Sequence, residues 1–125
     1  MLRILLAFIG VLVALTVWAQ PGQRVALVIG NDAYQGVSRL EKAGNDARAV
    51  AAKLTEAGFK TTLLLDANQR KMNAAVNRFA EAASAGGLGI VFFAGHGVQI
   101  NNQNYLLPVD FETPQNEADV ADQAV

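Results

Sequence analysis

The chain contains a single histidine, His96, and glycines flank it on both sides. His96 directly follows the apolar run 88–93, which has the composition of a buried strand. Reacting groups gather at the carboxyl ends of parallel strands, because the loops there are free to carry polar side chains. The glycines would let the backbone turn sharply, and the Gly97 N–H could stabilise an oxyanion while the imidazole carries protons. The pattern favours acyl-transfer chemistry over packing alone.

Alternating strands and helices must position this histidine. The apolar run 25–29 predicts a first strand buried on both faces, and residues 59–65 and 88–93 predict two more. Apolar residues at 47, 50, 51 and 54 lie on one stripe of a first helix, and a second helix over about 69–85 carries its own stripe. The order strand, helix, strand, helix, strand is typical of an α/β fold with a parallel sheet.

Local signals add four details. Asn45 or Asp46 is suited to cap the first helix, and glycines at 58 and 86–87 are placed to end the two helices. After His96, apolar residues on either side of the polar stretch 101–104 predict a small hairpin, since asparagine tolerates left-handed backbone angles. From Phe111 onward the sequence is polar and acidic, and we expect a loose segment there.

Several segments together resemble the caspase and metacaspase superfamily of cysteine endopeptidases. Residues 24–31 resemble the family's first strand, residues 40–47 resemble the start of its first helix, and His96 with its glycines matches the catalytic histidine. Residues 104–110 resemble the segment that follows this histidine in many bacterial members. The resemblance implies a three-layer α/β/α fold with a mainly parallel sheet, in which the third strand lies beside the first.

The resemblance also implies a catalytic dyad of which this chain carries one half. The family's nucleophile is a cysteine at the end of the next strand, and the sequence contains no cysteine. Histidine activates such a thiol by taking its proton, because the thiolate is the reactive form. We therefore expect residues 24–125 to be the amino-terminal portion of the domain, truncated after the third strand and hairpin and inactive alone. The third strand would then present a hydrophobic edge that invites self-association.

Substrate preference is a further implication of the resemblance. Members that cleave after aspartate use an arginine shortly before the first helix, whereas metacaspase-like members prefer arginine or lysine and use acidic residues. Asp46 lies at the position resembling the acidic specificity residue, and Leu40 lies where an arginine would be wanted. We expect cleavage after arginine or lysine, although Arg39 lies nearby and Asp46 also suits a purely structural helix cap.

The order of strands places more residues near His96. If the third strand lies beside the first, the loop after the first strand opens onto the same crevice. Asn31 and Asp32 begin this loop, and we expect both to face the cleft, with Asp32 in a substrate-binding role.

Composition excludes several other partners. A net charge of −1 without a basic cluster argues against nucleic acid, and peptides or proteins remain the expected substrates. With no cysteine, one histidine and no dense carboxylate loop, we expect neither a metal site nor a cofactor. The sequence also lacks a G-x-S-x-G element and a G-x-G-x-x-G element, which excludes the common serine hydrolases and dinucleotide-binding domains. A non-catalytic caspase-like module that binds peptides or partners stays open.

Residues 1–19 have the pattern of a signal peptide. A short positive start precedes the apolar core 4–17, and residues 17–19 form a small-x-small cleavage site. The core is short for a membrane span, although Trp18 near the boundary keeps an uncleaved membrane anchor as the alternative. Either outcome exports the domain, so we expect a periplasmic or extracellular location.

Overall fold

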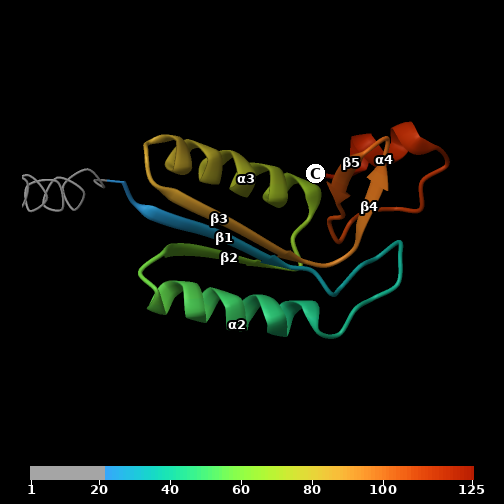
Figure 1. Ribbon diagram of the computed structural model, residues 1–125. Coiled ribbons are helices and arrows are strands. Elements are labelled where there is room, and N and C mark those ends of the chain that lie inside the picture. Colours follow the sequence, from blue (N-terminus) through green and yellow to red (C-terminus); the bar gives the residue numbers. More distant parts are fainter. Residues whose placement is uncertain (1–21) are drawn as a thin grey trace, which may run out of the picture.

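The computed structural model describes residues 22–125, so the predicted signal peptide lies outside the described residues. A three-stranded parallel sheet forms the centre, built from β1 (Arg24–Gly30), β2 (Lys60–Leu65) and β3 (Leu88–Ala94) in the order β2-β1-β3. Helix α2 (Ala43–Glu56) covers one face and α3 (Gln69–Ser84) covers the other (Figure 1). This arrangement confirms the predicted α/β class and the predicted neighbours of β1.

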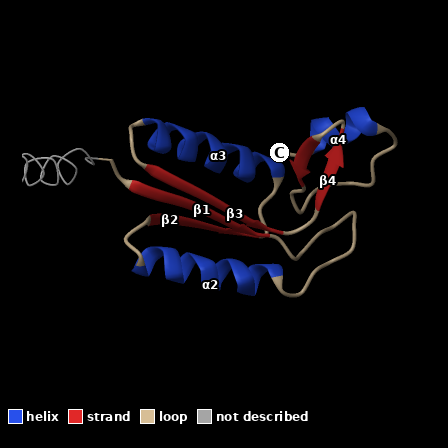
Figure 2. Cartoon of the chain, in the orientation of Figure 1, coloured by secondary structure: helices blue, strands red, loops and turns tan. Residues whose placement is uncertain are grey.

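A smaller unit follows β3. Strands β4 (Gly97–Ile100) and β5 (Gln103–Leu106) form an antiparallel pair, and a short helix, α4 (Glu117–Gln123), packs beside them at the carboxyl end of the sheet (Figure 2). Asn101 and Asn102 form the turn with φ values of 51° and 63°, which confirms the predicted hairpin and the reason for it. Within residues 22–125, no helix is long and apolar enough to cross a membrane.

The central strand β1 carries the core on both of its faces. Leu27 and Ile29 pack with Met72 and Ala75 of α3, whereas Val28 packs with small residues of α2. The continuous apolar run was the correct signal for a strand buried on both sides. Gly30 lets α2 approach closely, because a Cβ there would lie 2.6 Å from the carbonyl oxygen of Ala43.

The predicted cap of the first helix is wrong. Helix α2 begins at Ala43, and the residue in its N-cap position, Lys42, makes no side-chain capping bond. Instead, the two carboxylate oxygens of Asp32 accept hydrogen bonds from the Ala43 and Gly44 N–H groups, each at 2.8 Å. Asp32, in the loop after β1, therefore performs the task expected of Asn45 or Asp46, and Asp46 lies within the first turn of α2.

The helix ends follow the sequence more closely. Asn68 caps α3 by accepting from the Lys71 N–H at 2.9 Å. Gly58 and Gly86 adopt φ values of +91° and +86° just beyond α2 and α3, so glycine ends both helices as predicted.

The prediction of a loose segment after Phe111 is also wrong. Phe111, Val120 and Ala124 are buried against Tyr34 and Leu107 in a second hydrophobic cluster. Asn116 caps α4 by accepting from the Asp119 N–H at 3.1 Å. The few apolar residues of this acidic stretch are spaced to face one side of the segment. Burying them against a neighbouring hydrophobic cluster is enough to order it.

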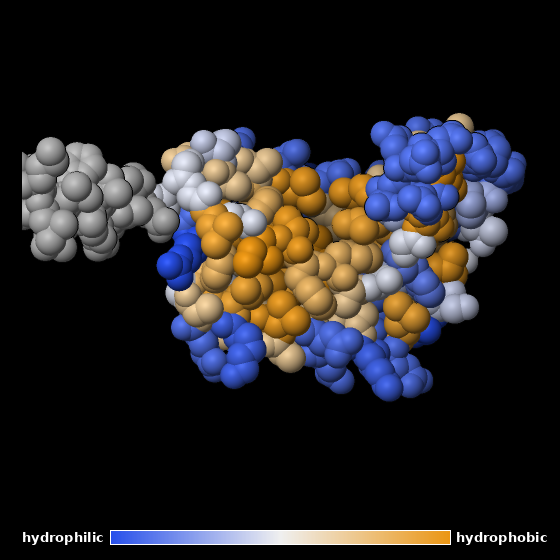
Figure 3. All heavy atoms as spheres, in the orientation of Figure 1, coloured by the Kyte–Doolittle hydropathy of each residue, from blue (hydrophilic) through white to orange (hydrophobic). Residues whose placement is uncertain are grey.

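Strand β3 forms one edge of the sheet. Leu88 and Val91 are 54% and 49% exposed, and Figure 3 shows apolar residues gathered on the face between α3 and α2. An edge of this kind can accept another strand. Self-association through it stays a prediction.

Candidate active site

The loops after β1 and β3 leave the sheet side by side. Gly30 pairs with Ala94 at the ends of the two strands, and the Asn31 N–H donates to the Ala94 carbonyl at 2.9 Å. His96 follows two residues later, so the loop after β1 passes beside the histidine. The carboxyl ends of the parallel strands therefore bring these two loops together, as expected for a site in this class of fold.

The His96 imidazole is held by a backbone carbonyl. Its Nε2 atom lies 2.7 Å from the carbonyl oxygen of Ser38, in the loop after β1. A carbonyl oxygen only accepts, so the hydrogen of the neutral imidazole belongs on Nε2 and the Nδ1 lone pair is left free. The geometry thus gives His96 one nitrogen that is anchored and one that can take a proton. The sequence could not mark Ser38 as a site residue, because it contacts the imidazole through its backbone carbonyl.

The backbone of His96 is fixed as well. The His96 N–H donates to the Tyr34 hydroxyl at 2.9 Å, and the His96 carbonyl accepts from the Leu107 N–H at 3.0 Å. The Tyr34 ring lies against the imidazole with its centroid 4.7 Å away. Tyr34 was not among the predicted site residues, although its place in the loop after β1 is a signal that could have marked it.

The two flanking glycines differ in what the fold requires of them. The chain bends at Gly95 as predicted, but neither Gly95 nor Gly97 has positive φ, so the bend does not use the left-handed backbone that glycine favours. Gly95 is needed for close packing, because a Cβ there would lie 2.6 Å from the Tyr34 hydroxyl oxygen. Gly97 has room for a Cβ, whose nearest neighbour would be 3.4 Å away. Its N–H as an oxyanion donor stays a prediction.

An open depression of about 470 Å³ lies against Ala94 and Gly95, the two residues that precede His96. We call it the Asp46 pocket, and it is lined by Arg39, Leu40, Glu41, Lys42, Ala43, Asp46, Ala94 and Gly95. The fold therefore brings Asp46 to the same hollow as the two residues that precede His96. The pocket also carries one further acidic and two basic side chains, so its charge is mixed.

The residues that begin the loop after β1 have other tasks. Asn31 is fully buried, and its side chain accepts from the Ala67 N–H at 2.9 Å and donates to the Leu107 carbonyl at 3.3 Å. The expectation that Asn31 faces the cleft is therefore wrong, since a strand-end residue can equally turn inward. Both carboxylate oxygens of Asp32 bind the start of α2, so its role toward a substrate stays a prediction that these contacts do not favour.

Asp66 completes this network and was missed by the sequence analysis. Its Oδ1 accepts from the N–H groups of Asp32 and Ala33, both at 2.9 Å, while its own backbone adopts φ of 51°. The hydrogen bond from the Ala33 N–H, followed by that from Asp32, holds the pKa of the Asp66 carboxyl below its usual value. Asp66 therefore ties the loop after β2 to the loop that reaches His96.

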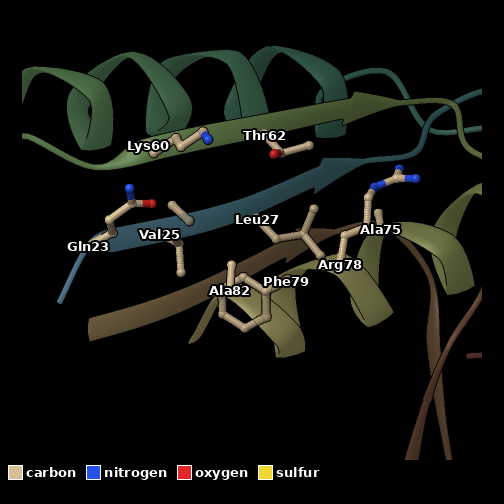
Figure 4. A pocket seen from close by; sticks show the side chains of 10 residues that line it. Gln23, Val25, Leu27, Lys60, Thr62, Ala75, Arg78, Phe79 and Ala82 are labelled. Atoms are coloured by element: carbon tan, nitrogen blue, oxygen red, sulfur yellow. The ribbon is translucent and has the colours of Figure 1, made fainter. Parts of the chain in front are cut away.

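A second hollow lies at the other end of the sheet. We call it the α3 groove; its volume is about 190 Å³, and it is lined by Gln23, Val25, Ala26, Leu27, Lys60, Thr62, Ala75, Arg78, Phe79 and Ala82. Figure 4 shows side chains of β1, β2 and α3 around it. It is remote from His96, because its strand residues come from the amino-terminal halves of β1 and β2. Among residues 22–125, no group of three or more His, Cys, Asp or Glu side chains is arranged to hold a metal ion.

Comparisons with known proteins bear on the family of this chain. The family model described as "Caspase domain" matches residues 23–122. The chain is 32% identical over 91 residues to human mucosa-associated lymphoid tissue lymphoma translocation protein 1 and, at the same identity, to its mouse homologue. The match covers 73% of this chain and 11% of each relative. The chain belongs to the caspase domain family.

Proposed function

We propose that residues 24–125 supply the histidine half of a caspase-like cysteine endopeptidase. The observation that carries the proposal is the placement of His96 at the carboxyl end of β3, with Nε2 bonded to the Ser38 carbonyl. That bond leaves Nδ1 as a proton acceptor on an imidazole whose position is fixed. Membership in the caspase domain family supports a protein substrate.

The proposed reaction needs a thiol from outside residues 1–125, since this sequence has no cysteine. The His96 imidazole would take the thiol proton as the sulfur attacks the scissile carbonyl, and would return it to the leaving amine. The Gly97 N–H would donate to the oxygen that becomes negative, and removing one such donor typically costs about 100- to 1,000-fold in rate. This chemistry requires no metal.

The first experiment tests the role of His96. The 125-residue chain alone should not cleave peptides that carry arginine, lysine or aspartate before the scissile bond. A longer chain, in which a cysteine-bearing strand follows Val125, should cleave, and His96→Ala should abolish turnover of every substrate. Turnover by the isolated chain that disappears in His96→Ala would show that the nucleophile is not a thiol, and the proposal would fail.

The second experiment tests the preference for a basic residue. The Asp46 pocket offers a carboxylate beside the residues that precede His96, which favours arginine or lysine before the scissile bond. In the longer chain, Asp46→Asn should reduce cleavage after arginine by about tenfold, the effect of losing one charge-assisted hydrogen bond. Glu41→Gln is the matched control, because it neutralises another carboxylate of the same pocket. Preference for aspartate in the unmodified protein would refute this assignment.

The alternative is a non-catalytic module that binds peptides. Residues 1–125 contain no cysteine, so the described site by itself could bind a peptide but supplies no thiol to cleave it. It predicts that the longer chain binds arginine-containing peptides without cleaving them, and that His96→Ala leaves this binding unchanged.

We also propose that residues 1–19 direct export. The mature protein should begin at or near Gln20, which amino-terminal sequencing of exported material would establish. Material that retains Met1 in the membrane fraction would favour an uncleaved anchor instead.

A further inference from the structure

Tyr34 closes a ring of hydrogen bonds around the backbone of His96. The Tyr34 side chain is 2% exposed, and its hydroxyl accepts from the His96 N–H and donates to the Leu107 carbonyl, both at 2.9 Å. The Leu107 N–H in turn donates to the His96 carbonyl at 3.0 Å. One buried hydroxyl thus joins the loop after β1, the turn that carries the histidine and the residue that follows β5.

The Tyr34 ring also restricts the imidazole. The two ring centroids lie 4.7 Å apart with 58° between the planes, and the imidazole Nε2 contacts the Ser38 carbonyl at 2.7 Å. Rotation of the imidazole would lose one of these contacts. Glycine at position 95 makes the arrangement possible, because a Cβ there would lie 2.6 Å from the tyrosine hydroxyl oxygen.

We propose that Tyr34 is a positioning residue for His96, whose hydroxyl and ring hold the imidazole so that Nε2 keeps its hydrogen and Nδ1 stays free. The importance of this orientation rests on the proposed role of His96 as proton carrier. The orientation itself is a property of the folded chain, with or without a nucleophile. Burial raises the pKa of the Tyr34 hydroxyl, which keeps it protonated and able to donate to Leu107 at neutral pH.

The single histidine allows a direct test by nuclear magnetic resonance. In the full 125-residue chain, the ¹⁵N shifts of one imidazole report which ring nitrogen carries the hydrogen. Tyr34→Phe keeps the ring and removes the hydroxyl, so the Nε2–H to Nδ1–H ratio of neutral His96 should fall about fivefold, as expected for the loss of one net hydrogen bond. The His96 amide should exchange with solvent faster by a similar factor.

Two further variants make the test decisive. Tyr105→Phe is the matched control, since it removes the other tyrosine hydroxyl of the chain, which bonds the Gln103 side chain, and it should change neither readout. Gly95→Ala keeps Tyr34 but would place a Cβ 2.6 Å from its hydroxyl oxygen and 2.7 Å from the Phe93 ring, so we expect it to displace the hydroxyl and reproduce the Tyr34→Phe spectrum. If Tyr34→Phe does not fold, Gly95→Ala decides the matter alone.

The proposal would be overturned if folded Tyr34→Phe showed an unchanged tautomer ratio and unchanged amide exchange. If Tyr34→Phe does not fold, the same result in Gly95→Ala would overturn it. Neither readout depends on peptide cleavage. A normal tautomer response in a chain that never acquires activity would therefore count against the proposed function and leave the role of Tyr34 standing.

Discussion

The two ends of the central sheet are built differently. At the carboxyl end, the side chains of Asn31, Asp32 and Asp66 each accept backbone N–H groups from a different segment of the chain. At the amino end, Arg24 donates to the Ala57 carbonyl at 3.2 Å from an exposed position, and the α3 groove lies open above β1 and β2. Side chains therefore hold the loops at the carboxyl end of the sheet, whereas backbone hydrogen bonds at the ends of α2 and α3 hold most of the turns at its amino end.

The difference shows why a hollow alone does not identify a site. The α3 groove has apolar walls, yet its polar side chains do not converge on one point that the structure holds in place (Figure 4). Beside the Asp46 pocket, a network of satisfied polar groups fixes the loops that carry His96 and Ser38. Buried polar networks of this kind specify one geometry when every member has a partner, and in the described residues no buried side-chain N or O atom lacks one.

Removing the Asn31 side chain, at the carboxyl end of the sheet, should cause the largest loss of stability. Asn31→Ala leaves the buried Ala67 N–H without its acceptor and opens a small cavity. We expect a loss of about 2–4 kcal/mol in the free energy of unfolding, measured with urea. Thr62→Val in the α3 groove is the control at the other end, and it should change stability by no more than about 0.5 kcal/mol. Equal losses of stability from the two substitutions would contradict the difference between the two ends of the sheet.

Neutralising Asp66 should give a smaller effect that depends on pH. Asp66→Asn keeps a left-handed backbone and an acceptor oxygen but removes the charge, and we expect a loss of about 1 kcal/mol at pH 7. Because the folded-state pKa of Asp66 is lowered, its carboxylate adds stability above the ordinary aspartate pKa, and this contribution disappears as pH falls through the folded-state value. Urea unfolding at pH 7 and pH 3 should show the difference between the two proteins shrinking in acid.

A difference of equal size at both pH values would mean that the charge of Asp66 is not what stabilises the loop. Asp66→Ala provides a second check on the backbone. It should cost about 1 kcal/mol more than Asp66→Asn, because alanine tolerates a φ of 51° less well.

The sequence predicted what depends on local pattern. The run 25–29, the apolar stripes of both helices and the asparagine turn each bear the periodicity or residue type of their element, so strands, helices and hairpin were found nearly in place. His96 could be singled out because its neighbours along the chain carry the signal. Asp46 could be placed at the start of α2 for the same reason, although it lies within the first turn and does not cap the helix.

The sequence could not show contacts between distant segments. Asp32 binds the start of α2 across 11 and 12 residues, Asp66 reaches the loop after β1 across 33 and 34, and Ser38 meets His96 across 58. None of these pairs has a local spacing rule. Helix α4 was missed for a related reason, because its stability comes from burying Val120 against a cluster supplied by other parts of the chain.

The smallest effect on stability is expected at the amino end of the sheet, where Arg24 makes its hydrogen bond from a solvent-exposed position. Arg24→Ala removes the bond to the Ala57 carbonyl, which water can replace because both residues are exposed. We expect the free energy of unfolding to change by less than about 0.5 kcal/mol, and the His96 ring resonances to stay where they are. Urea unfolding and the imidazole spectrum measure the two quantities on one sample. A loss above about 1 kcal/mol, or a shifted imidazole, would mean that the two ends are coupled through β1 and that the amino end also helps to position the site.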